Sequence, residues 1–139
     1  MYRALDPYHV NIRQSSGLSD VSDGIIRRGE VSLFHCGLTK LPIFKYISGN
    51  LDINSNLLTN LNGCPIYVGG NLYCSDNLLS NLDGGPLFVY GNYFCGHNQL
   101  ISWDGGPQYV KGKLICNNNR SWILHNPTNI FMGKGCSIG

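Results

Sequence analysis

Three consecutive blocks decide the fold. Residues 49–69 read GNLDINSNLLTNLNGCPIYVG, residues 70–90 read GNLYCSDNLLSNLDGGPLFVY, and residues 91–111 read GNYFCGHNQLISWDGGPQYVK. They align without a gap at a period of 21 residues, and a fourth block, GKLICNNNRSWIL from Gly112, begins in the same way. Repetition at a fixed period of this length is typical of solenoids, in which each repeat forms one coil.

Several residue types recur at one place in each coil. Glycine recurs at Gly49, Gly70, Gly91 and Gly112, asparagine at Asn56, Asn77, Asn98 and Asn119, and proline at Pro65, Pro86 and Pro107. A β-branched residue recurs at Ile26, Ile47, Val68, Val89 and Val110. An earlier coil over residues 31–42 keeps the apolar spacing, with Cys36 in the asparagine column and a one-residue departure from the period on each side.

The columns predict how each coil is built. Side chains alternate along a strand, so Leu72 and Cys74 should point inward and Tyr73 outward, with successive strands pairing in parallel about 4.8 Å apart. The asparagines should form a buried ladder, because a buried amide needs partners. The Gly84-Gly85-Pro86 sequence predicts a tight turn, followed by a second extended piece over residues 87–89.

The segment L-x-L-x-x-N-x-L-x-x-L resembles the leucine-rich-repeat consensus, whose conserved polar position accepts Asn or Cys. The resemblance covers residues 25–124, with Cys at a strand leucine and Trp103 at the last leucine of the later coils. The short coil, the Gly-Gly-Pro turns and the richness in Asn and Gly are most similar to small leucine-rich-repeat proteins of bacteriophages. The resemblance implies that ligands dock on the outward face of the strands.

We therefore expect a β-rich solenoid with one short parallel strand per 21-residue coil and few or no helices. A parallel β-helix is the alternative architecture. Residues 1–139 should form a single domain, with an N-terminal cap over 1–24, about five repeats of 20–21 residues over 25–124, and a C-terminal cap or tail over 125–139. Caps are expected because repeat arrays need closed or polar ends.

Composition excludes some classes of function. Charged residues make up 13% of the chain and the formal net charge is +2, with lysines and arginines dispersed along the sequence. Nucleic-acid recognition would favour a basic stripe, so we expect no nucleic-acid partner. The start lacks a secretory signal and no segment is long enough to span a membrane, so we expect a cytoplasmic protein with reduced cysteines and no membrane partner.

A search for catalytic and metal-binding groups finds no constellation. Cys74, Cys95 and Cys116 fall in one inward column, which cannot surround a metal tetrahedrally. Asp76 and His97 fall in one outward column and are expected to form a surface ion pair, but no nucleophile has a matching position. We expect no enzyme, no metal and no cofactor.

The binding surface is predicted from the outward columns. Tyr73, Phe94 and Ile115 are adjacent large side chains facing water, and such patches tend to mark interfaces. The other predicted contact residues are Phe34, His35, Asp52, Asp76 and His97. A second surface is the predicted tyrosine strip, which consists of Tyr46, Tyr67, Phe88 and Tyr109.

The expected function is that of a non-catalytic protein-binding module. The bacteriophage resemblance implies an inhibitor that occludes a host protein or defence complex. The alternative is a structural or assembly protein that self-associates through the solenoid edges or the aromatic residues. Either reading allows a monomer or a small homo-oligomer.

Overall fold

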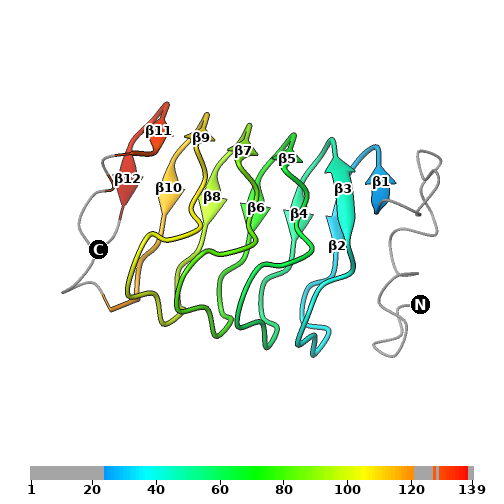
Figure 1. Ribbon diagram of the computed structural model, residues 1–139, viewed down its shortest axis with the longest axis horizontal. Coiled ribbons are helices and arrows are strands. Elements are labelled where there is room, and N and C mark those ends of the chain that lie inside the picture. The colour runs from blue at the N-terminus through cyan, green and yellow to red at the C-terminus, as the bar shows by residue number, and fades with distance from the viewer. Residues whose placement is uncertain (1–23, 121–126, 128, 138–139) are drawn as a thin grey trace.

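The computed structural model shows a parallel β-solenoid of about five turns of roughly 21 residues (Figure 1), which confirms the predicted fold class. The structure describes residues 24–120, 127 and 129–137, and over these residues it contains strands and turns but no helix. The predicted N-terminal cap lies outside the described residues except for Gly24.

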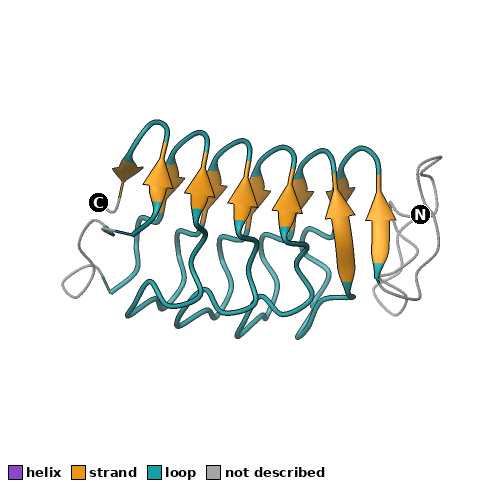
Figure 2. Ribbon diagram, turned by 45° about the horizontal axis from the view of Figure 1, so that its top comes forward, coloured by secondary structure: helices purple, strands orange, loops and turns teal. Residues whose placement is uncertain are grey.

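Each coil contributes two strands, so the second extended piece of the repeat is itself part of a sheet (Figure 2). The first sheet, in spatial order, comprises β1 (Ile25–Arg27), β3 (Phe44–Ile47), β5 (Tyr67–Val68), β7 (Phe88–Val89), β9 (Tyr109–Val110) and β11 (Phe131–Met132). The second comprises β2 (Val31–Ser32), β4 (Leu51–Asp52), β6 (Leu72–Tyr73), β8 (Tyr93–Phe94), β10 (Leu114–Ile115) and β12 (Cys136–Ser137). We call them the β1–β11 sheet and the β2–β12 sheet.

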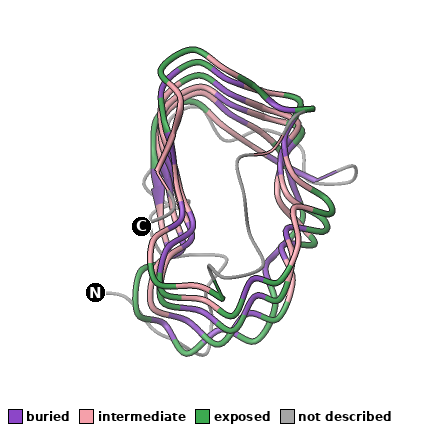
Figure 3. Cartoon of the chain, turned by 90° about the vertical axis from the view of Figure 1, so that its left-hand side faces the viewer, coloured by how far each residue is buried: buried purple, intermediate pink, exposed green. Residues whose placement is uncertain are grey.

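The core is a stack of inward columns, as the alternation predicted. Leu51, Leu72, Tyr93 and Leu114 align across the β2–β12 sheet and are fully buried. Val68, Val89 and Val110 do the same across the β1–β11 sheet. Along the solenoid axis, the same burial class recurs at the same place in successive coils (Figure 3). One coil cannot bury its apolar edge alone, so neighbouring coils stabilise one another.

The asparagine ladder is confirmed. The Asn77 amide donates to the carbonyls of Cys74 and Ser75 in its own coil and to that of Ile53 in the preceding coil. Its Oδ1 accepts from the Leu58 N–H at 3.1 Å. Asn56, Asn98 and Asn119 repeat this pattern. These side chains tie each coil to the one before it.

A second asparagine ladder lies in the turn between the two sheets. Oδ1 of Asn50 accepts from the N–H of Asn71, Oδ1 of Asn71 from that of Asn92, and Oδ1 of Asn92 from that of Lys113, at 2.7–2.8 Å. The preceding glycines are required, because a Cβ on Gly91 would lie 2.3 Å from the Asn71 Oδ1. The recurrent Gly-Asn pair in the sequence signalled this ladder, which we had not predicted.

The first coil is out of register with the others, as its shorter spacing predicted. Ile26 pairs with Tyr46 and Arg27 with Ile47, with an irregularity between Ile25 and Ile26 that leaves Lys45 as the extra residue of β3. Placing Ile26 in the column of Ile47 was therefore wrong by one residue. A β-bulge shifts every following side chain by one position in this way.

The described part of the tail continues both sheets. β11 pairs with β9 and β12 with β10, and Ile130 is buried against the core. The apolar residues Trp122, Ile123 and Leu124 lie outside the described residues.

Candidate interaction surfaces

The first predicted surface lies on the outer face of the β2–β12 sheet. Tyr73, Phe94 and Ile115 occupy consecutive positions of one column, which also contains Ser32, Asp52 and Ser137. The rings of Tyr73 and Phe94 stack with centroids 4.9 Å apart and planes inclined by 1°. All three large side chains are half-buried, so the parallel coils bring them together as predicted.

Hydrogen bonds fix the polar groups beside this column. The Asn71 amide donates to the Tyr73 hydroxyl at 2.9 Å. Oδ1 of Asp52 accepts from the Asn54 N–H, and Oδ1 of Asn54 accepts from the Ser75 N–H. Burial raises the pKa of Asp52 against the lowering effect of the bond from Asn54, and the charge of Glu30 raises it further. These hydrogen bonds therefore fix the polar side chains of this surface.

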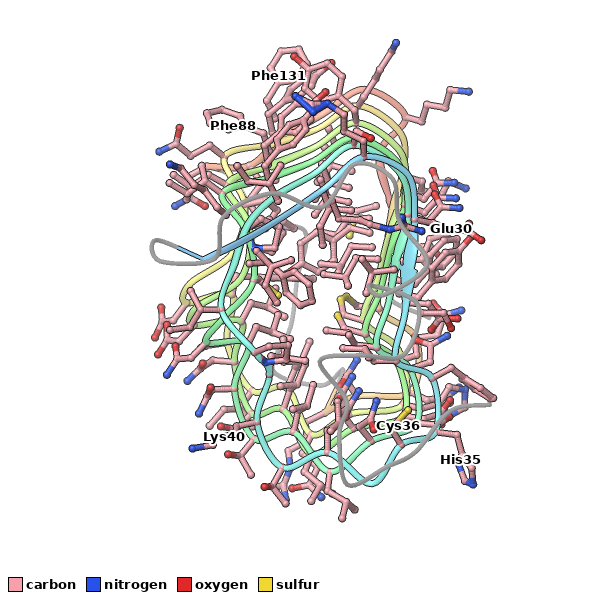
Figure 4. All side chains as sticks on the ribbon, turned by 90° about the vertical axis from the view of Figure 1, so that its right-hand side faces the viewer. Glu30, His35, Cys36, Lys40, Phe88 and Phe131 are labelled. Atoms are coloured by element: carbon pink, nitrogen blue, oxygen red, sulfur yellow. A yellow bond between two sulfur atoms is a disulfide. The ribbon has the colours of Figure 1, made fainter. Side chains whose placement is uncertain are left out.

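Phe34 and His35 extend the predicted contact set at the N-terminal end of the same face. Phe34 is 54% exposed, and its ring lies 5.8 Å from that of His35. Figure 4 shows His35 pointing away from the coil while Cys36 points into it. These two exposed rings are separated from Tyr73 by the coil that carries Asp52.

Asp76 and His97 do not form the predicted ion pair. The His97 ring instead places Nε2 3.1 Å from the Asn118 amide of the next coil. Asp76 and His97 belong to a column of residues with positive φ, between 51° and 58°. The column consists of His35, Ser55, Asp76, His97 and Asn118. The chain turns sharply here, and every member of the column except Ser55 is a His, Asp or Asn, the non-glycine residue types that are enriched in this left-handed conformation. This property of the column was not predicted from the sequence.

The predicted tyrosine strip is present on the β1–β11 sheet with one rearrangement. Tyr46, Tyr67, Phe88 and Tyr109 share one column of the ladder, and Phe131 adds a further member. The ring contacts, however, pass through Tyr90, which lies 5.0 Å from Tyr67 and 5.7 Å from Tyr109. We call the set Tyr46, Tyr67, Tyr90, Tyr109 and Phe131 the ring chain.

Gly69 explains why Tyr90 takes this position. Gly69 precedes Tyr90 by one period, and a Cβ there would lie 2.1 Å from the Ser48 carbonyl oxygen. The position therefore carries no side chain, which leaves room for the Tyr90 ring to lean over Tyr67. Burial, together with the neighbouring hydroxyls of Tyr46 and Tyr90, raises the pKa of Tyr67.

The cysteine column departs from expectation in one respect. Cys74, Cys95 and Cys116 are fully buried, as predicted, but the structure joins Cys95 to Cys116 by a disulfide between neighbouring coils. Their Cα atoms lie 4.6 Å apart, within the range that a disulfide spans. The expectation that all three thiols are reduced was therefore wrong for this pair. The parallel register places cysteines of the same column side by side in neighbouring coils. Cys74 remains a free thiol.

A polar group is buried inside the solenoid beside the free thiols. The Tyr93 hydroxyl has no hydrogen-bond partner among the described residues. Tyr93 occupies a leucine position, and its hydroxyl would lie 3.0 Å from a Cβ on Gly85, so the glycine makes room for it. Burial raises the pKa of Cys64 to about 12 and holds that of Tyr93 well above its usual range. These groups are neutral at physiological pH.

Over the described residues, no cluster of three His, Cys, Asp or Glu side chains could hold a metal ion. None of the described segments forms a helix long and apolar enough to cross a membrane. The sequence matches no family model, no curated protein and no solved structure. The surfaces described above are therefore the basis for a functional proposal.

Proposed function

We propose that this chain is a non-catalytic protein-binding module whose partner docks on the outer face of the β2–β12 sheet. The observation that carries this proposal is the stacked pair of Tyr73 and Phe94 with Ile115 beside it, in a solvent-facing column. Aromatic side chains dominate interface energetics when they are buried by a partner.

The geometry favours binding because these side chains have little freedom to lose. The two rings restrict one another, and the Tyr73 hydroxyl is held by Asn71. Immobilising a flexible side chain costs about 0.5–1.5 kcal/mol on association, and a surface that is already ordered avoids much of that cost. Asp52, Asn54 and Ser75 provide the polar rim that protein interfaces usually have.

The resemblance to small bacteriophage leucine-rich-repeat proteins supports a more specific form of the proposal. In that form, the partner is a host protein or a defence complex, and the solenoid inhibits it by covering its surface. The competing form is an assembly protein that binds further copies of itself. A measurement of mass in solution separates them, because an inhibitor of this kind is a stable monomer and an assembly protein forms an ordered oligomer.

The same proposal places the protein in the cytoplasm, where stable disulfides are rare. Cells can therefore be lysed in an alkylating reagent and the bond between Cys95 and Cys116 examined at once. Free thiols at both positions would support the cytoplasmic location, whereas an intact bond would argue for an oxidising compartment.

The test of the binding face is quantitative affinity capture from host lysate followed by mass spectrometry. Tyr73→Ala/Phe94→Ala should weaken capture of the partner by about 2 kcal/mol or more, roughly 30-fold, as expected for interface hot spots. The matched control is Tyr90→Ala/Phe131→Ala, which removes two aromatic rings from the other sheet. If Tyr73→Ala/Phe94→Ala captures the same proteins as the wild type in the same amounts, the β2–β12 sheet is not the interface.

A further inference from the structure

The ring chain runs along the solenoid axis on the face opposite to the core of the β1–β11 sheet. Its rings are in contact from each member to the next, with centroid distances of 5.3 Å for Tyr46 and Tyr67, 5.0 Å for Tyr67 and Tyr90, 5.7 Å for Tyr90 and Tyr109, and 5.6 Å for Tyr109 and Phe131. Tyr90 is 47% and Phe131 67% exposed. The ring chain is thus a continuous aromatic surface, and it is more exposed than the Tyr73–Phe94 pair.

The fold also gathers positive charge around this surface. Six of the eight lysines and arginines among the described residues lie on the β1–β11 sheet or in the turns that follow its strands: Arg27, Arg28, Lys45, Lys111, Lys113 and Lys134. Of the five described carboxylates, only Glu30 lies in this region. Figure 4 shows Glu30 on the side of the β2–β12 sheet, away from Phe131.

These charges bracket the ring chain at its two ends. Arg28 belongs to the first coil, whereas Lys111 and Lys134 lie in the turns that follow β9 and β11, the strands that carry Tyr109 and Phe131. Lys113 lies farther along the first of these turns, directly before β10. Lys111 follows Tyr90 by one period, and the Tyr90 ring contacts Tyr67 and Tyr109, so the repeat places Lys111 on the same side of the sheet as the ring chain. An aromatic centre with charged groups at its margins is the usual anatomy of a protein interface.

The positive charge around the ring chain argues against a second copy of this protein as the partner that binds there. A symmetric dimer through this surface would bring the same patch of each subunit together. The cationic ends would then face cationic groups, and like charges across an interface cost several kcal/mol. An acidic surface gains from the same arrangement.

The contacts between the rings argue against single-stranded nucleic acid as the partner of the ring chain. Bases bind such platforms by stacking on free aromatic faces. Here the faces of Tyr46 and Tyr67 stack on one another at 13°, and Tyr90 lies between Tyr67 and Tyr109. The ring chain therefore presents ring edges and hydroxyl groups to a partner. Tyrosine hydroxyls can donate hydrogen bonds to carboxylates.

We infer that the ring chain and its flanking lysines form a second binding surface, for an acidic protein segment that also carries apolar side chains. The apolar side chains would cover Tyr90 and Phe131, while the carboxylates would pair with Lys111 and Lys134. This surface is distinct from the proposed face of the β2–β12 sheet, so either one can fail without the other.

Fluorescence anisotropy with the full chain tests this inference using four defined probes. They are a labelled peptide of alternating Glu and Leu, the matched peptide of alternating Lys and Leu, an oligothymidine of similar length, and vesicles containing phosphatidylserine. We expect the Glu–Leu peptide to bind at least about 10-fold more tightly than the Lys–Leu peptide or oligothymidine, because charge complementarity sets specificity. Its binding should weaken as salt is raised.

Three variants locate the binding. Tyr90→Ala/Phe131→Ala and Lys111→Glu/Lys134→Glu should each weaken the Glu–Leu peptide by about 10-fold, since one removes aromatic anchors and the other reverses the charge. Tyr73→Ala/Phe94→Ala should bind it as the wild type does. All four rings are at least partly exposed and both lysines are exposed, and a melting curve for each variant verifies folding.

The inference is overturned if the Glu–Leu peptide does not bind, if it binds no better than its lysine counterpart, or if neither of the first two variants weakens it. Tighter binding of oligothymidine or of the vesicles would also overturn it, in favour of a nucleic acid or an anionic membrane. Loss of binding in Tyr73→Ala/Phe94→Ala alone would place the acidic segment on the other sheet.

Discussion

The rings of Tyr73 and Phe94 lie parallel to within 1°, at a centroid distance of 4.9 Å, although 21 residues separate them in the sequence. The strands that carry them pair in register, so the distance between the rings is close to the spacing of strands in a sheet. Each ring therefore contributes both to the proposed binding face and to the contact between two coils.

A double-mutant cycle on thermal or denaturant unfolding measures the second of these contributions, the contact between the two coils. Tyr73→Ala and Phe94→Ala should show a coupling energy of about 0.5–1.5 kcal/mol, the range for aromatic pairs. A cycle between Tyr73 and Tyr109, which lie on different sheets, is the control and should give a coupling near zero. A Tyr73–Phe94 coupling no larger than the control would show that the rings do not stack in solution.

Asn77 should be indispensable to the stability of the central coils. Asn77→Ala removes three donated bonds and one accepted bond, leaving buried backbone groups unpaired, so unfolding should become easier by about 1–3 kcal/mol. The control is Asn81→Ala, which removes a single bond from an exposed turn. Equal losses in the two variants, measured by denaturant unfolding, would contradict the buried ladder.

The main features of the fold could be predicted from the sequence because it repeats. A period of 21 residues with leucine or cysteine at Leu72 and Cys74 determines which side chains face inward, and recurrence of Asn77 determines the ladder. Such columns are enough to predict a solenoid, since each coil needs its neighbours to bury its apolar edge.

Departures from the period, and contacts between columns, could not be predicted in the same way. The bulge at Lys45 shifted Ile26 out of its expected column, and nothing in the residue types of β1 shows where an extra residue falls. Tyr90 entered the ring chain because Gly69 leaves space beside it, a contact between two columns that alignment treats separately. The cations appear dispersed along the sequence and gather only when the coils are stacked.

The Tyr93 hydroxyl should reduce the stability of the folded protein. It is buried without a partner among the described residues, and an unsatisfied buried polar group costs about 1–3 kcal/mol. Tyr93→Phe keeps the ring and should therefore raise the free energy of unfolding by about 1 kcal/mol. Tyr109→Phe is the control, because its hydroxyl lies on the outer surface and its loss should change little. A decrease in stability for Tyr93→Phe would indicate that the hydroxyl has a partner in solution.

Asp52 should make stability depend on pH in acid. Its pKa is raised on folding, so the folded state binds its proton more tightly than the unfolded state does. The group therefore favours folding below its unfolded pKa, and this contribution is lost as the pH rises through the folded value. Asp52→Asn can still accept the bond from Asn54, so it should melt at a higher temperature than the wild type at about pH 7 and show no such gain at about pH 3. A gain of equal size at both values would mean that ionisation of Asp52 is not the cause.

The positive-φ column offers the most direct test of the backbone geometry. Ser55 has a φ of 58°, a conformation that costs residues with a Cβ about 1–2 kcal/mol. Glycine adopts it freely but loses more conformational entropy on folding, roughly 0.5–1 kcal/mol, so Ser55→Gly should stabilise the protein by about 0.5–1 kcal/mol. Ser75 is the matched control, because it lies next to this column at negative φ, in a position that the following coil fills with Gly96. Ser75→Gly carries the entropic cost without relief of strain, and should destabilise by about 0.5–1 kcal/mol. Opposite shifts of the denaturation midpoint for the two serines would verify the left-handed turn, whereas a loss of stability in both would mean that Ser55 does not adopt it.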